Sequence, residues 1–148
     1  MGVRRQGREL ALKALYQIEL SGDGSVEALR LLFSSFPADE RARNFARILV
    51  DGVLAQKDLI DEHLTQALAH WSIKRLSRID HNIMRMALFE LMKLDDVPTR
   101  VTMDEAIELA KKYGDKDSGH FVNGVLDELA ERLRLKGKGE SSDASRQN

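Results

Sequence analysis

The stretch that decides the fold is residues 102–133, TMDEAIELAKKYGDKDSGHFVNGVLDELAERL, which has the pattern of two consecutive helices. Thr102 and Glu105 have the spacing of a capping box at the start of the first helix. Gly114 is a typical helix stop. The second helix then presents an apolar stripe, formed by Val122, Val125, Leu126, Leu129 and Leu133.

One dipeptide in this stretch resists a local explanation. Asn123-Gly124 is normally a hairpin signal, yet it lies inside the second helical pattern, which Asp117 or Ser118 can cap. A glycine inside a helix costs about 1 kcal/mol relative to alanine. The simplest explanation is the close approach of a neighbouring helix at Gly124, and we expect that here.

The rest of the chain also predicts helices, so the fold class is all-α. Only 2 prolines and 10 glycines occur in 148 residues, and no strand-like alternation is evident. Helices are expected at 4–20, 26–36, 39–69 and 78–94. Ser77 should cap the last of these helices. That helix has apolar residues on nearly every side, so we expect it at the centre of its lobe. Residues 1–135 are expected to form a single helical domain or two small lobes, and 136–148 a disordered tail.

Composition excludes several classes of function. The chain has no cysteine, which rules out disulfides, thiolate catalysis and cysteine-based zinc sites. The basic N-terminus lacks the apolar run of a signal peptide, and no segment is long enough to span a membrane, so a cytoplasmic protein is expected. The net charge is −1, so any nucleic-acid site must be a local basic patch.

No pattern indicates catalysis, a metal or a cofactor. The four histidines, His63, His70, His81 and His120, show no fixed metal-ligand spacing. Residues 61–63, DEH, look like a ligand cluster, but consecutive helical positions point in different directions. The chain also lacks a phosphate loop and a nucleophile elbow. We therefore expect neither an enzyme nor a bound cofactor.

Two features have both a structural and a functional interpretation. Arg4, Arg5 and Arg8 cluster at the start of the first helix, where they are either a solvated face or a phosphate-binding group. Positive charge at a helix N-terminus opposes the helix dipole, which favours the second interpretation. Phe121 is either a core residue or a platform on which an unpaired base stacks, and Tyr16 is either a core residue or part of the wall of the same groove.

Several segments resemble the NusB family of bacterial transcription antitermination factors. The strongest are DEAIELA at 104–110 and FVNGVLD at 121–127, and the resemblance extends from position 4 to about 133. It implies about seven helices in two packed helical subdomains. It also implies binding to the boxA sequence of nascent RNA together with NusE, a small-subunit ribosomal protein. The complex helps RNA polymerase to read through terminators, notably in ribosomal RNA operons.

The resemblance assigns roles to individual positions. It places RNA contacts on Arg4, Arg5, Arg8, Tyr16, Asp117 and Phe121. It places a contact to NusE on Asp80. Two departures stand out: Gln6 and Gly7 interrupt the arginine run, which should weaken the phosphate patch, and Asp104 replaces a frequent asparagine.

Two rival functions remain open on the sequence alone. One is the non-catalytic RNA-binding domain of a ribosomal RNA cytosine methyltransferase, but the chain shows no methyl-donor domain. The other is a purely structural helical dimer without RNA affinity. The sequence leaves the oligomeric state undecided, so a homodimer stays open as a further partner.

Overall fold

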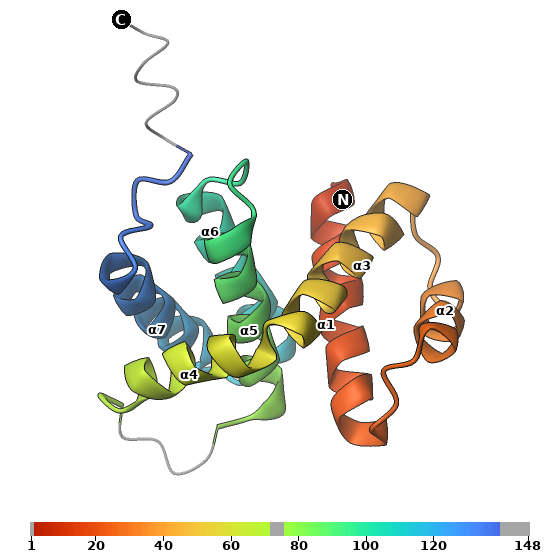
Figure 1. Cartoon of the computed structure of the whole chain (residues 1–148), viewed down its shortest axis with the longest axis horizontal. Coiled ribbons are helices and arrows are strands. Elements are labelled where there is room, and N and C mark those ends of the chain that lie inside the picture. The colour runs from red at the N-terminus through yellow and green to blue at the C-terminus, as the bar shows by residue number, and fades with distance from the viewer. Residues whose placement is uncertain (1, 72–75, 140–148) are drawn as a thin grey trace, which may run out of the picture. The chain divides into compact units, whose positions relative to one another are not determined.

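The structure is a computed structural model that describes residues 2–71 and 76–139. These residues contain seven α-helices and no strand (Figure 1). The helices are α1 (Val3–Ser21), α2 (Val26–Ser34), α3 (Glu40–Ala55), α4 (Lys57–Leu68), α5 (Arg78–Lys93), α6 (Thr99–Tyr113) and α7 (Ser118–Arg132). The predicted all-α class is confirmed. The chain divides into two compact units, Met1–Ala55 and Gln56–Asn148, and each is described by itself.

The first unit is built on the packing of α1 against α3. Gly7 makes this close approach possible, because a β-carbon there would lie 2.8 Å from Cδ2 of Phe45 and 2.9 Å from the carbonyl oxygen of Ala42. The interruption of the arginine run at Gly7 therefore has a packing cause. The shorter α2 is capped by Ser25, whose side chain accepts a hydrogen bond from the N–H of Ala28, and it buries Leu29 and Phe33.

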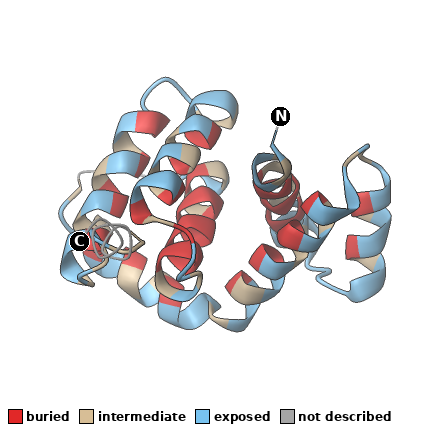
Figure 2. Cartoon of the chain, turned by 90° about the horizontal axis from the view of Figure 1, so that it is seen from above, coloured by how far each residue is buried: buried red, intermediate tan, exposed pale blue. Residues whose placement is uncertain are grey.

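Helix α5 lies at the centre of the second unit and is buried along most of its length (Figure 2). Helices α4, α6 and α7 all pack against it. Its apolar side chains, among them Ile83, Met84 and Leu88, are almost fully buried. The oxygen of Ser77 accepts the N–H of Asp80 at 3.1 Å and caps the helix. Both the central position of this helix and its cap are confirmed.

The single helix predicted at 39–69 is wrong. The chain leaves helical geometry at Gln56, with φ −110° and ψ 16°, which separates α3 from α4. The buried stripe continues across the break, from Val53 to Ile60, at a helical spacing of seven residues. Periodicity alone therefore could not show that the two halves of the stripe belong to different units.

The capping box predicted at Thr102 is also wrong, because α6 begins one turn earlier. Its first residue is Thr99 and its N-cap is Pro98, whose fixed φ suits a helix start. Thr102 is buried, and its hydroxyl donates to Oε1 of Glu90 at 3.3 Å. Gly114 is confirmed as the stop of α6. Asp117 is the N-cap of α7, although its side chain makes no capping hydrogen bond.

Part of the predicted tail is attached to the second unit. Lys138 Nζ donates to the carbonyl oxygens of Glu90 and Leu94, both at 2.9 Å, and so caps the end of α5. The Thr99 hydroxyl donates to the carbonyl oxygen of Leu135. The disordered tail predicted from residue 136 is therefore wrong for residues 136–139, which the structure describes. Residues 140–148 lie outside the described residues. None of the helices in the described ranges is long and apolar enough to cross a membrane.

Candidate nucleic-acid interface

In the first unit, two of the arginines at the start of α1 share one aromatic partner. The guanidinium carbons of Arg4 and Arg8 lie 5.2 and 5.4 Å from the centre of the Phe45 ring on α3. At these distances a cation is attracted by the ring. Phe45 thus fixes two positive charges one helical turn apart.

A solvated face and a phosphate-binding group would both expose the side chains of the cluster, and Arg8 is an exception. Arg4 and Arg5 are exposed, whereas Arg8 is only 3% exposed. The close α1–α3 packing at Gly7 draws the next residue, Arg8, onto the Phe45 ring. Arg4 and Arg5 are therefore the accessible guanidinium groups, and Arg8 contributes packing as well as charge.

The helix end beneath these arginines also favours an anion. The N-cap of α1 is Gly2, which offers no side-chain hydrogen bond, and no acidic residue occurs in the first turn. Such an end presents backbone N–H groups and the positive end of the helix dipole. Tyr16, two turns after Arg8 on α1, is half-buried, so part of its ring is accessible. Its role in RNA binding stays a prediction.

In the second unit, Phe121 is held by an aromatic neighbour that its sequence pattern did not reveal. Phe121 lies in the first turn of α7 and is half-buried. The Trp71 ring packs against it edge to face, with 5.2 Å between centroids and 80° between planes. Trp71 makes a second contact of this kind with His120, at 6.4 Å. One side of Phe121 is thus fixed while part of the residue stays accessible.

Trp71 also explains the glycine inside α7. A β-carbon on Gly124 would lie 2.5 Å from Cζ2 and 2.7 Å from Cη2 of the indole ring. The close approach predicted at Gly124 is therefore real, but a tryptophan side chain makes it rather than a neighbouring helix. The Asn123-Gly124 dipeptide was the sequence signal from which this contact could have been suspected.

Asp80 links the start of α5 to the start of α7. Its Oδ2 accepts a hydrogen bond from the Ser118 hydroxyl at 3.0 Å, while its Oδ1 is buried without a partner. Ser118 in turn accepts the N–H of Asp115 at 3.0 Å. The N–H of Asp117 donates to Oδ1 of Asp115 at 2.8 Å. Asp80 therefore helps to position the turn that carries Asp117.

The environment of Asp80 disfavours its charged form. Burial raises the pKa of the carboxyl group, and the nearby charge of Asp115 raises it further, while hydrogen bonds from Ser118 and Ser77 act in the opposite direction. The residue is only 6% exposed. Any contact of Asp80 with a partner must therefore use a small accessible part of the side chain, and that contact stays a prediction.

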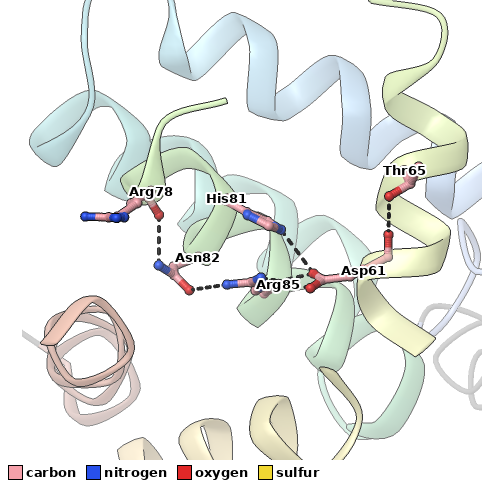
Figure 3. Close-up of polar contacts among 6 residues, drawn as sticks. All are labelled: Asp61, Thr65, Arg78, His81, Asn82 and Arg85. Atoms are coloured by element: carbon pink, nitrogen blue, oxygen red, sulfur yellow. Dashed lines mark hydrogen bonds and ion pairs between the residues drawn. The ribbon is translucent and has the colours of Figure 1, made fainter. Parts of the chain in front are cut away.

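A second polar cluster, between α4 and α5, is structural (Figure 3). Arg85 donates to both carboxylate oxygens of Asp61 at 2.8 Å, and His81 Nε2 lies 3.0 Å from Oδ1. Burial opposes the charge on Asp61, but Arg85 and His81 outweigh it and hold its pKa below the usual value. Asp61 is thus committed to this ion pair. Among the described residues, no group of three or more side chains is placed to hold a metal ion.

The predicted site residues fall into two groups, one in each unit. The first group lies on α1 and consists of Arg4, Arg5, Arg8 and Tyr16. The second group lies around the starts of α5 and α7 and consists of Asp80, Asp117 and Phe121. Sequence reasoning missed the two aromatic residues that hold these groups, Phe45 and Trp71.

Comparison with known proteins identifies the family. The family model described as the NusB family matches residues 5–131. The transcription antitermination protein NusB of Trichlorobacter lovleyi is 46% identical over 129 residues, which cover 87% of this chain and 91% of that protein. The protein of the same name from Geobacter sulfurreducens is 46% identical over 138 residues, covering 93% of this chain and all of the relative.

Solved structures agree with these relatives. NusB of T. maritima superposes with a TM-score of 0.76 and 40% identity, covering 86% of this chain and 90% of that one. A crystal structure of antitermination factors NusB and NusE in complex with dsRNA gives a TM-score of 0.77 at 28% identity, covering 89% and 98%. This chain therefore belongs to the NusB family, whose matched relatives are transcription antitermination proteins.

Proposed function

We propose that this protein binds boxA-type single-stranded RNA together with NusE and promotes read-through by RNA polymerase, notably in ribosomal RNA operons. The observation that carries the proposal is the placement of Arg4 and Arg8 over one ring at an uncapped helix start. Guanidinium groups bind phosphates through two parallel hydrogen bonds, and the helix end adds N–H donors. The arrangement suits an RNA backbone.

Base recognition belongs to the second unit in this proposal. Phe121 has an accessible part and a fixed edge, which are the properties of a platform for an unpaired base. Asp117, exposed at the start of α7, can accept hydrogen bonds from base edges. Phosphate contacts then position the strand, and contacts to bases supply sequence preference.

NusE enlarges the binding surface, and the function needs no catalytic step. The support for this partner is the solved complex of a related NusB with NusE and RNA. Its RNA is described as double-stranded, whereas our proposal concerns a single strand. We place the NusE contact near Asp80, at the start of α5. Action within an RNA polymerase complex implies a cytoplasmic location.

A read-through assay tests this function. A template with boxA upstream of a terminator is transcribed by bacterial RNA polymerase with the other antitermination factors present. Adding this protein with NusE should increase the fraction of transcripts that extend past the terminator on the boxA template only. A template whose boxA is scrambled is the control. Equal read-through on the two templates, or none on either, would refute the proposal.

A further inference from the structure

A second group of arginines in the first unit surrounds a pocket between α2 and α3. The cavity has a volume of about 250 Å³. Its lining comprises Arg30, Phe33 and Ser34 of α2 and Arg43, Asn44 and Arg47 of α3. The positive charges of three guanidinium groups around one cavity attract an anion into it. No role assigned above uses this pocket.

Arg43 is held in place in the pocket wall and has unused hydrogen-bonding capacity. Its Nη2 donates to the carbonyl oxygen of Phe36 at 3.2 Å, which fixes the guanidinium. Its Nε is buried and has no hydrogen-bond partner. A buried donor without a partner is costly. An anion drawn into the pocket would lower this cost by adding negative charge beside the guanidinium.

The other two arginines can be released to a ligand. Arg30 pairs with Glu27 at 2.6 Å, and both side chains are 65% exposed. Arg47 lies 3.5 Å from Asp51, with side chains 38% and 60% exposed. Exposed ion pairs of this kind contribute little to stability. The negative charge of a phosphate, whether inorganic or in an RNA backbone, can therefore compete with these carboxylates.

The pocket lies on the side of α3 opposite the arginines of α1. Arg43 and Arg47 each lie two positions from Phe45, which is about 200° around α3. Phe45 faces Arg4 and Arg8 on α1, so the pocket opens on the other side of the same helical turn. A helix with its side chains is about 10–12 Å across. An RNA strand that contacts Arg4 can therefore reach the pocket within a few nucleotides.

We infer that the pocket lined by Arg30, Arg43 and Arg47 binds a backbone phosphate of RNA that flanks the boxA core. This inference rests on the proposed function and extends it to a second phosphate site. The site lacks the accessible aromatic face needed to stack a base, because Phe33 is buried. It therefore binds the flanking RNA without sequence preference.

The test compares two RNAs and three variants. One RNA is the boxA core, and the other is the same core flanked on both sides by uridines. The variants are Arg43→Ala with Arg47→Ala, then Arg43→Lys, and finally Arg41→Ala as the matched control. Arg41 lies in the same helix turn but is exposed, pairs with Asp39 and does not line the pocket. Affinity is measured with NusE over a salt series, after thermal melting has shown that each variant is folded.

The wild-type protein should bind the flanked RNA more tightly than the core, and the double variant should lose that gain. Its log–log salt slope on flanked RNA should fall by roughly 0.7, since the pocket binds one phosphate and each phosphate bound on a single strand contributes about 0.7. The core affinity should stay unchanged, and so should both affinities of Arg41→Ala. Arg43→Lys should keep most of the slope but bind the flanked RNA less tightly, because lysine lacks the bidentate fork.

Other results would overturn the inference. An unchanged flanking gain in the double variant would show that RNA does not enter the pocket. A second probe, inorganic phosphate at constant ionic strength, should reduce the flanking gain but spare core binding. If phosphate instead bound without altering either RNA affinity, the pocket would be a site for small anions. Failure of the wild-type protein to bind the core at all would refute the proposed function itself.

Discussion

The indole ring of Trp71 occupies the space that a side chain on Gly124 would need. The separation from an ideal β-carbon is 2.5 Å, which is shorter than real β-carbon contacts. The same ring supports Phe121 from the side at 5.2 Å. A glycine in α7, a tryptophan just after α4 and a candidate base-stacking residue thus form one packing unit. The conformation of Phe121 therefore depends on Gly124.

Gly124→Ala should destabilise the protein although alanine is the better helix former. Moving the indole ring should cost about 1–3 kcal/mol, more than the helical gain of about 1 kcal/mol. Trp71 is the only tryptophan in the chain, so its fluorescence should report the displacement directly. Gly119→Ala is the matched control, because its new β-carbon would come closest to the flexible side chain of Lys111, at 3.3 Å. Equal melting temperatures for both variants would contradict the packing described.

Arginine variants on α1 should separate phosphate binding from packing. Arg4→Ala with Arg5→Ala should lower RNA affinity and reduce the salt slope by roughly 0.7 for each phosphate that is no longer bound, with little change in melting temperature. Arg8→Ala should also lower the melting temperature, because Arg8 is buried on Phe45. Salt titrations and thermal melts of the two variants provide the comparison. A double variant with a wild-type salt slope would show that these arginines do not contact RNA.

Phe121→Ala should affect RNA binding more than folding. Removal of a fully buried phenylalanine costs about 3–5 kcal/mol, but Phe121 is half-buried, so the loss of stability should be clearly smaller. The RNA affinity should fall by about 1–3 kcal/mol if a base stacks on the ring. RNA titration well below the melting temperature measures the second quantity alone. A large drop in stability with unchanged RNA affinity would identify Phe121 as a core residue only.

Asp80 and Asp61 should change stability with pH in opposite directions. The pKa of Asp80 is raised in the folded state, so its contribution is fully present below the unfolded pKa and is lost as pH rises through the folded pKa. Asp80→Asn should therefore gain stability relative to wild type as the pH rises from about 4, near a free carboxyl pKa, to about 7. The pKa of Asp61 is lowered, so its contribution is present above the unfolded pKa and disappears as pH falls through the folded value.

Urea denaturation across this pH range measures both effects. Asp61→Asn should lose stability relative to wild type near neutral pH, by roughly 3 kcal/mol, because the buried Arg85 loses the carboxylate charge with which it pairs. Parallel pH profiles for the two variants would contradict the assigned environments.

Asp80→Lys is a poor probe of the NusE contact, because it places a cation at a buried position. Its loss of partner binding would be meaningful only alongside a normal melting temperature.

Local sequence patterns predicted the helices well where an apolar stripe packs into the core of a single unit. The bounds expected for α1 and α5 differ by about one residue from those observed, because each helix has a continuous apolar face, Gly22 is the C-cap of α1 and Ser77 caps α5. The break at Gln56 was missed because the apolar period passes through it unchanged. The start of α6 was missed because Pro98 caps it through its backbone conformation alone, which leaves no side-chain pattern to read.

The candidate site was less accessible to sequence reasoning. Composition and spacing suggested a phosphate-binding role for Arg4, Arg5 and Arg8, but burial of Arg8 depends on Phe45, which is distant in sequence. The contact between Phe121 and Trp71 likewise joins α7 to the residues just after α4, which are distant in sequence. The roles of Asp80 and Asp117 came from family resemblance and not from their residue types. Long-range packing, rather than local preference, decides which of these side chains is exposed.

Equilibrium binding of boxA RNA is the most direct test of the central claim, that this protein recognises that RNA together with NusE. Labelled boxA RNA and a scrambled RNA of equal length are titrated with the protein, with and without NusE, at one fixed salt concentration. The account predicts tighter binding to boxA than to the scrambled RNA, a gain in affinity when NusE is added, and loss of the boxA preference in Phe121→Ala. Equal affinity for both RNAs in the presence of NusE would contradict it.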